Sequence, residues 1–102
     1  EQWCEDIRNE YENKFISISE LLLDMLKANQ NYDEIIDYSE KLLKHDILNE
    51  HAHISLIDTY KKLDKTKKAK DAYSRMLSIY ENQLGEKPNV KVLTMIENTL
   101  AK

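Results

Sequence analysis

The chain has 102 residues, 41 % of them hydrophobic, and 15 Lys and Arg against 19 Asp and Glu give a formal net charge of -4. One Gly and one Pro are too few for a loop-rich or β-rich fold, so we expect an all-α chain. We expect one domain over residues 1–102, large enough to bury roughly 60 to 70 % of its unfolded surface. The negative charge disfavours nucleic-acid binding by the domain as a whole, because duplex affinity depends on neutralising phosphates.

The single cysteine, Cys4, cannot form an internal disulfide, which fits a reducing compartment. No apolar run is long enough to cross a bilayer, and the first residues are acidic and polar, unlike a secretion signal. We therefore expect a cytoplasmic protein with no membrane partner.

Residues 1–29 contain neither Gly nor Pro and predict one long helix. Segment 15–19 alternates apolar and polar residues as a strand does, but its flanks keep helical periodicity and no turn residues adjoin it. The predicted apolar stripe of this helix is Trp3, Ile7, Tyr11, Phe15, Ile18, Leu22 and Met25.

A polar break at residues 29–31 separates this helix from the next one. Asn31, with Glu34 three residues later, predicts a capping box, and the second helix should end near His45. Asn49 is expected to cap a third helix that begins at Glu50.

Residues 49–88 predict an antiparallel helical hairpin, because apolar residues recur at helical spacing on both sides of a short turn. Ala69 and Ala72 are small enough for the two backbones to approach closely. Gly85 supplies the left-handed residue that ends a helix, and Pro88 presets the start of a last helix from about Asn89. The stripes are His53, Leu56, Ile57, Tyr60 and Leu63, then Ala69, Ala72, Tyr73, Met76, Leu77, Tyr80 and Leu84.

The two halves repeat at an offset of 34 residues, which aligns Asp24 with Asp58 and Lys27 with Lys61. That period is typical of tetratricopeptide repeats. Ile35 and Ser39 replace the small and aromatic residues in the first copy, so a plain helical bundle stays open. The expected fold is a tetratricopeptide-like, right-handed stack of antiparallel helix hairpins with about five helices.

The order of these features resembles the bacterial transcriptional activator domain. The resemblance covers essentially the whole chain and is most specific in residues 80–88, YENQLGEKP, and in DILNEHAH from Asp46 to His53. Ile47 stands where the family usually has Pro, and the Gly usual near residues 63–65 is missing. Further residues that carry it are Trp3, Arg8, Leu56, Ala69 and Tyr73.

The resemblance implies a regulatory and dimerisation module of a transcriptional activator. Such a module follows a winged-helix DNA-binding domain, sometimes with a receiver domain of a two-component system in the same polypeptide. It implies protein partners: a second copy, other domains of the same regulator, or RNA polymerase. DNA would be contacted only through a domain outside this sequence. The rival interpretation is a generic tetratricopeptide adaptor or chaperone that binds a peptide.

Candidate catalytic, cofactor and metal sites find no support in the sequence. There is no Gly-rich phosphate loop and no nucleophile with a neighbouring base, so we expect neither an enzyme nor a cofactor. His51 and His53 are two residues apart on a helix and face different sides, which disfavours a shared metal. Glu50 and His53 are suitably spaced for a charged pair, with capping and packing as the alternative.

Six lysines surround the turn in residues 61–70, KKLDKTKKAK. Thr66 is placed to cap the following helix, whose free amides, with Lys65, Lys67 and Lys68, are candidates to hold an anion such as a DNA phosphate. A solvated turn is the simpler interpretation.

The repeat alignment also predicts a protein-binding groove along the first helices of the two hairpins. Glu20, Asp24 and Asp58 would make it acidic and suited to a basic or helical segment, although Lys27 and Lys61 can neutralise it. The alternative is that the final helix or a dimer mate fills it. The groove-facing positions are Ser17, Glu20, Asp24, Lys27, His51, Ile54, Asp58 and Lys61.

Overall fold

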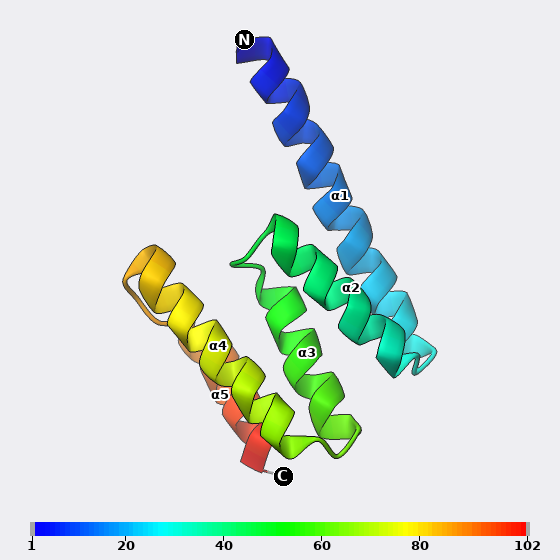
Figure 1. Cartoon of the computed structure of the whole chain (residues 1–102), viewed down its shortest axis with the longest axis vertical. Helices are drawn as coiled ribbons and strands as arrows, with labels where there is room; N and C mark the ends of the chain where they lie inside the picture. Colours follow the sequence, from blue (N-terminus) through cyan, green and yellow to red (C-terminus); the bar gives the residue numbers. More distant parts are fainter. Residues whose placement is uncertain (1, 102) are drawn as a thin grey trace.

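A computed structural model describes the backbone of residues 2–101 and the side chains of residues 9–101. These residues form five helices and no strand (Figure 1). The prediction of an all-α chain is confirmed, and residues 15–19 lie inside a continuous helix. No helix in this part of the chain is both long enough and apolar enough to span a bilayer. The helices are α1 (Gln2–Ala28), α2 (Tyr32–His45), α3 (Glu50–Lys62), α4 (Thr66–Leu84) and α5 (Val90–Ala101).

The helix α3 lies at the centre of the molecule and contacts each of the other four helices. Its buried face includes Ala52, His53, Leu56, Ile57 and Thr59. Short turns fold α1 against α2 and α3 against α4 as antiparallel pairs, and α5 packs on α3 and α4 (Figure 1). The expected stack of helix hairpins is therefore confirmed.

The two hairpins share the same turn at the predicted offset of 34 residues. Gln30 and Asp64 both adopt the left-handed conformation, with φ of 57° and 62°. The next amide then donates back across the turn, from Asn31 to the carbonyl of Leu26 at 3.0 Å and from Lys65 to that of Tyr60 at 2.8 Å. This is the Schellman ending of a helix. It needs no glycine here, although a non-glycine residue is strained in it.

Helix capping follows the sequence at three positions. The Asn49 side chain accepts a hydrogen bond from the Ala52 amide at 2.9 Å and caps α3 as predicted. Gly85 ends α4 with a left-handed φ of 67°. The last helix starts one residue later than expected, after Asn89. The Asn89 side chain caps it by accepting a hydrogen bond from the Lys91 amide at 2.8 Å, and Pro88 lies buried before that cap.

Two predicted caps are wrong. Asn31 makes no side-chain capping hydrogen bond, and Thr66 is the first residue of α4 and not its cap. The capping positions are Asn31 and Lys65, which have ψ angles of 71° and 63° and come directly after the left-handed Gln30 and Asp64. Neither has the extended conformation in which a side chain reaches back to the first turn.

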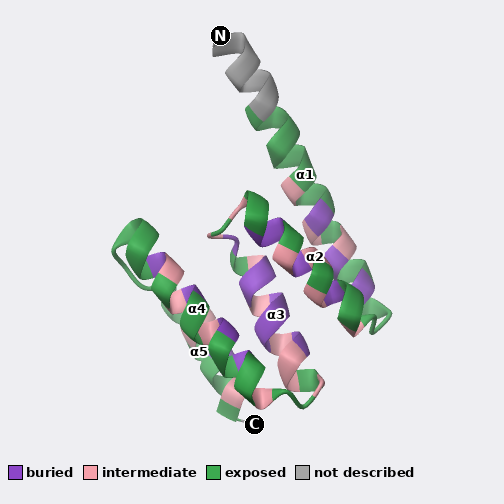
Figure 2. Cartoon of the chain, in the orientation of Figure 1, coloured by how far each residue is buried: buried purple, intermediate pink, exposed green. Residues whose placement is uncertain are grey.

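The buried face of α1 differs from the predicted stripe. Ser19, Leu23 and Leu26 are buried, whereas Tyr11 and Ile18 are 75 % and 65 % exposed. The buried parts of α1 lie in the half of the helix beside α2 (Figure 2). Every face of a helix has three- and four-residue spacing, so periodicity did not identify the face that α2 covers. Of the rest of the predicted stripe, Leu22 is half-buried, Phe15 and Met25 are exposed, and the side chains of Trp3 and Ile7 lie outside the described residues.

Candidate protein-binding surface

The predicted groove corresponds to a surface where α1 and α3 contact each other side by side, which we call the α1–α3 surface. Asp24 Oδ1 lies 3.2 Å from His51 Nε2. The Asn49 side chain, beside its capping bond, donates to Glu20 Oε2 at 3.2 Å. The structure thus brings together side chains that are 27 and 29 residues apart in the sequence. We define the α1–α3 surface by Glu20, Asp24 and Lys27 of α1 and by His51, Ile54, Asp58 and Lys61 of α3.

Its carboxylates already have partners within the chain. Asp58 pairs with Lys62 one helical turn later, at 3.2 Å, and not with Lys61. Lys27 is half-buried between the helices, where burial lowers the pKa of its ammonium group and the nearby Asp24 and Asp58 oppose that shift. The surface is therefore of mixed charge, less acidic than the sequence suggested.

Other helices leave this surface uncovered on the side of α1. The final helix α5 contacts α3 and α4 but not α1, so it does not fill the predicted groove. Ile54 and Lys61 are half-buried on α3, and the side chain of Asp24 is 61 % exposed despite its contact with His51. Ser17 is exposed and lines a shallow hollow on α1 with Asn9, Glu10, Asn13, Lys14 and Ile18.

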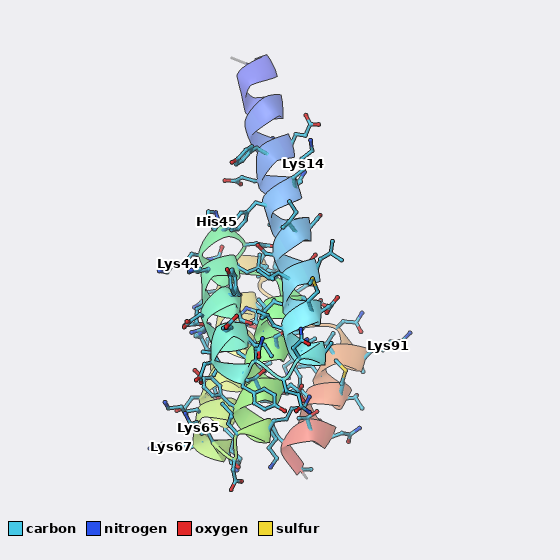
Figure 3. The ribbon with its side chains drawn as sticks, turned by 90° about the vertical axis from the view of Figure 1, so that its right-hand side faces the viewer. Lys14, Lys44, His45, Lys65, Lys67 and Lys91 are labelled. Carbon is cyan, nitrogen blue, oxygen red and sulfur yellow. The ribbon has the colours of Figure 1, made fainter. Side chains whose placement is uncertain are left out.

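The predicted anion patch lies at the start of α4. Lys65, Lys67 and Lys68 are exposed, Thr66 is half-buried, and no acidic residue occupies the first turn. Lys68 leans over the Tyr60 ring, with its ammonium 5.9 Å from the ring centre. Lys65 and Lys67 lie far along the molecule from Lys14 of α1 (Figure 3). The patch and the outer part of α1 are therefore separate surfaces.

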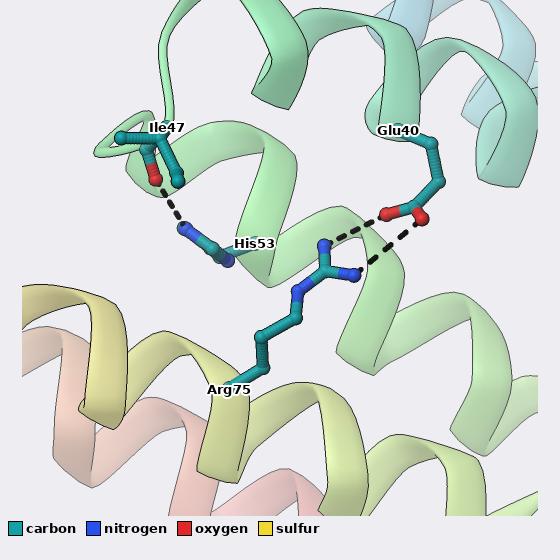
Figure 4. Close-up of polar contacts among 4 residues, drawn as sticks. All are labelled: Glu40, Ile47, His53 and Arg75. Carbon is teal, nitrogen blue, oxygen red and sulfur yellow. Dashed lines mark hydrogen bonds and ion pairs between the residues drawn. The ribbon is translucent and has the colours of Figure 1, made fainter.

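A polar contact from α3 holds the turn between α2 and α3. His53 is 1 % exposed, and its Nε2 lies 2.8 Å from the carbonyl oxygen of Ile47 (Figure 4). Because a carbonyl only accepts, this nitrogen carries the proton and donates. The charged pair that the spacing of Glu50 and His53 allows is not formed, since the ring contacts the carbonyl of Ile47; His53 is packed in the core, as in the alternative interpretation. His51 points instead toward Asp24, so the two histidines do face different sides.

Sequence reasoning missed the contact between α2 and α4. Both terminal nitrogens of the Arg75 guanidinium group donate to the Glu40 carboxylate, at 2.7 and 3.4 Å (Figure 4). A hollow beside this pair is lined by Leu43, Lys44, Ile47 and Ile79 as well. Residues 35 positions apart have no shared local pattern, so no sequence signal pointed to the pair.

No three His, Cys, Asp or Glu side chains gather in a way that would hold a metal ion, within the part of the chain whose side chains are described. The side chain of Cys4 lies outside that part.

Residues 1–100 match the family model of the bacterial transcriptional activator domain. A search of the curated proteins and a search of the solved structures each returned no match. The family match spans nearly the whole chain, including both hairpins and most of α5. The chain therefore belongs to the bacterial transcriptional activator domain family, which is a family of regulatory domains and not of enzymes.

Proposed function

We propose that the chain, as one domain, is the regulatory and dimerisation module of a cytoplasmic bacterial transcriptional activator. In this proposal a winged-helix domain outside the chain contacts DNA. The module contacts a second copy, other domains of the same regulator, or RNA polymerase. The family match over residues 1–100 carries the proposal, and the surface formed by α1 and α3 supports a role in protein contact.

The α1–α3 surface is the candidate site for a partner segment. It offers an exposed carboxylate at Asp24 and two half-buried lysines, Lys27 and Lys61. A helical segment with charges of both signs fits such a surface better than a purely basic one. If the surface binds a partner, replacing Asp24 and Asp58 by Ala weakens that binding or self-association; unchanged binding in both assays would remove the α1–α3 surface from the proposal.

The lysine patch at the start of α4 is a candidate contact to the DNA backbone, beside the winged helix of the intact regulator. Exposed ammonium groups of Lys65, Lys67 and Lys68 accompany free amides of a helix start, where a phosphate is stabilised. Reversing these three charges should flatten the dependence of DNA affinity on salt, because each phosphate contact releases counterions. An unchanged slope would leave the patch as a solvated turn.

A fusion assay tests the dimerisation proposal directly. The chain replaces the dimerisation domain of a repressor whose DNA-binding part represses a reporter only as a dimer. Repression supports self-association, and a reporter that stays active at equal fusion level contradicts it. The rival adaptor function rests on the 34-residue repeat seen in both hairpin turns. The sequence next to residues 1–102 in the gene product separates the two, since a winged-helix pattern supports the activator and further repeats support the adaptor.

A further inference from the structure

One side of α1 carries large apolar side chains that no other part of the described chain covers. Tyr11 is 75 % exposed, Ile18 and Leu21 are both 65 % exposed, and Met25 is 62 % exposed. At 100° per residue these four side chains share one side of the helix, about a third of a turn from the buried Ser19, Leu23 and Leu26. We call this set the α1 outer face. Figure 2 shows the exposed surface running along α1 beyond its contact with α2.

The α1 outer face is large for an isolated apolar patch. Added together, the four exposed fractions correspond to nearly three fully exposed large side chains. At about 150 to 250 Å² for each, the exposed apolar area is roughly 500 Å². The largest apolar patch on a typical monomer is roughly 300 to 600 Å² and often has a function. Two such faces pressed together would bury about 1,000 Å², which is the lower end of what a specific dimer needs.

The spacing along the α1 outer face suits a second copy of the same helix. Tyr11, Ile18 and Met25 follow each other at seven-residue intervals, and Leu21 follows Ile18 by three, as in the seam of a two-stranded coiled coil. In an antiparallel pair whose two-fold axis passes between Ile18 and Leu21, Ile18 of one copy faces Leu21 of the second copy. Tyr11, the largest residue of the face, then lies opposite the small, exposed Ala28.

Charge selects the antiparallel arrangement. Lys14 stands in the same seam, three residues after Tyr11, and its side chain is 73 % exposed. A parallel pair would place Lys14 against Lys14 of the other copy. The antiparallel pair places it opposite Met25 of the other copy and next to Asp24, whose carboxylate lies 3.2 Å from His51 but whose side chain is still 61 % exposed. The other sides of α1 are occupied by α2 and α3, and the outer face points away from both.

We propose that two copies of this chain pair through the α1 outer face as an antiparallel two-helix seam centred between Ile18 and Leu21. The proposal rests on the proposed dimerisation function and gives it an interface. Because the buried area is small, the dimer is weak and dissociates into monomers on dilution.

The test is sedimentation equilibrium of the full chain over a wide range of concentration, with matched variants. Ile18→Glu should weaken the dimer at least tenfold, because it places a charge at the centre of the seam. Val90→Glu is the control, since Val90 is 76 % exposed on α5 and outside the seam, and it should dimerise as the original chain does. Lys14→Glu should weaken the dimer, and adding Asp24→Lys should restore it. Circular dichroism of each variant checks that the helices are kept.

Crosslinking tests the direction. In a Cys4→Ser background, a mixture of Tyr11→Cys and Ala28→Cys chains should form a disulfide-linked heterodimer, and Tyr11→Cys alone should not crosslink. Efficient crosslinking of Tyr11→Cys alone would overturn the antiparallel seam. A dimer that Ile18→Glu leaves intact would overturn the interface but keep the dimerisation function. A chain that stays monomeric at all concentrations would overturn both.

Discussion

The hydroxyl group of Tyr80 on α4 donates a 2.7 Å hydrogen bond to the carbonyl oxygen of Leu48, in the turn between α2 and α3. Tyr80 is 5 % exposed, and burial raises the pKa of its phenol to about 12, with smaller contributions from Glu50 and Asp46. Its ring also meets His53 edge-on, with centroids 6.2 Å apart. One side chain thus ties the second hairpin to the end of the first.

Replacing Tyr80 by Phe keeps the ring and removes this bond. We expect a loss of about 1 kcal/mol in the free energy of unfolding, because the Leu48 carbonyl loses its buried partner. Urea denaturation measures the loss. Tyr11→Phe is the matched control, since Tyr11 is 75 % exposed, and equal effects of the two substitutions would contradict the role given to Tyr80.

The buried His53 makes stability depend on pH. Burial lowers the pKa of its imidazole below 6.5; the Ile47 carbonyl, Glu40 and Asp46 oppose the shift, and Arg75 adds to it. The folded chain therefore binds fewer protons than the unfolded one, and stability increases with pH in this range. The contribution is complete above pH 6.5 and is lost as the pH falls from there toward the lowered folded pKa.

We expect the free energy of unfolding to fall by at most about 1.4 kcal/mol per pH unit from this group as the pH drops below 6.5. His53→Gln keeps a donor for the Ile47 carbonyl and removes the titrating group. Its free energy of unfolding should therefore change less than that of the original chain between roughly pH 7.5 and 5.5, the range in which His titrates. His45→Gln, an exposed position, serves as control. Parallel pH profiles for His53→Gln and the original chain would contradict this assignment.

Gln30 has a left-handed φ of 57° that glycine adopts without strain. Gln30→Gly should raise stability by roughly 0.5 to 1 kcal/mol, because relief of strain exceeds the greater freedom of glycine in the unfolded chain. Gly85→Ala should have the opposite sign: an added Cβ would meet nothing within 4 Å, so its cost comes from the φ of 67° alone. Thermal unfolding of both variants checks the pair of signs, and equal signs would refute the strain argument.

Asn49 caps α3 and joins α1 through Glu20. Asn49→Ala should cost about 1 to 2 kcal/mol, at the upper end for a lost cap, because Asn49 is 7 % exposed and its capping bond and its bonds to Glu20 and Asp46 all disappear. Asn89→Ala removes a cap on an exposed helix and should cost less. Urea denaturation measures the loss in the free energy of unfolding for both variants. A larger loss for Asn89→Ala than for Asn49→Ala would contradict the central place of α3.

Local signals in the sequence were enough for the helices, and distant contacts were not. Asn49 and Gly85 act through neighbours three or four residues away, so their roles could be read directly. The left-handed Gln30 and Asp64 lack the glycine that usually marks such a turn. The pairing of Glu40 with Arg75 and the choice of buried face on α1 depend on how whole helices dock, which periodicity does not specify.

The same limit applies to the candidate surfaces. Asp24 and Asp58, which the 34-residue repeat aligns, lie on the contacting helices α1 and α3. The repeat did not identify their partners, His51 and Lys62, because these contacts depend on side-chain conformation. The predicted apolar stripe includes Tyr11, Ile18 and Met25 of the α1 outer face but not Leu21, so periodicity alone does not reveal this exposed face.

Hydrogen exchange of the full chain at low and high protein concentration tests the account most directly. We predict that α3 amides exchange most slowly at both concentrations, because α3 contacts all four other helices. Amides around Ile18 and Leu21 should gain protection as the concentration rises and lose that gain in Ile18→Glu. Faster exchange in α3 than in α5 would contradict the hairpin stack. Protection of α1 amides that changes neither with concentration nor with Ile18→Glu would contradict pairing through α1.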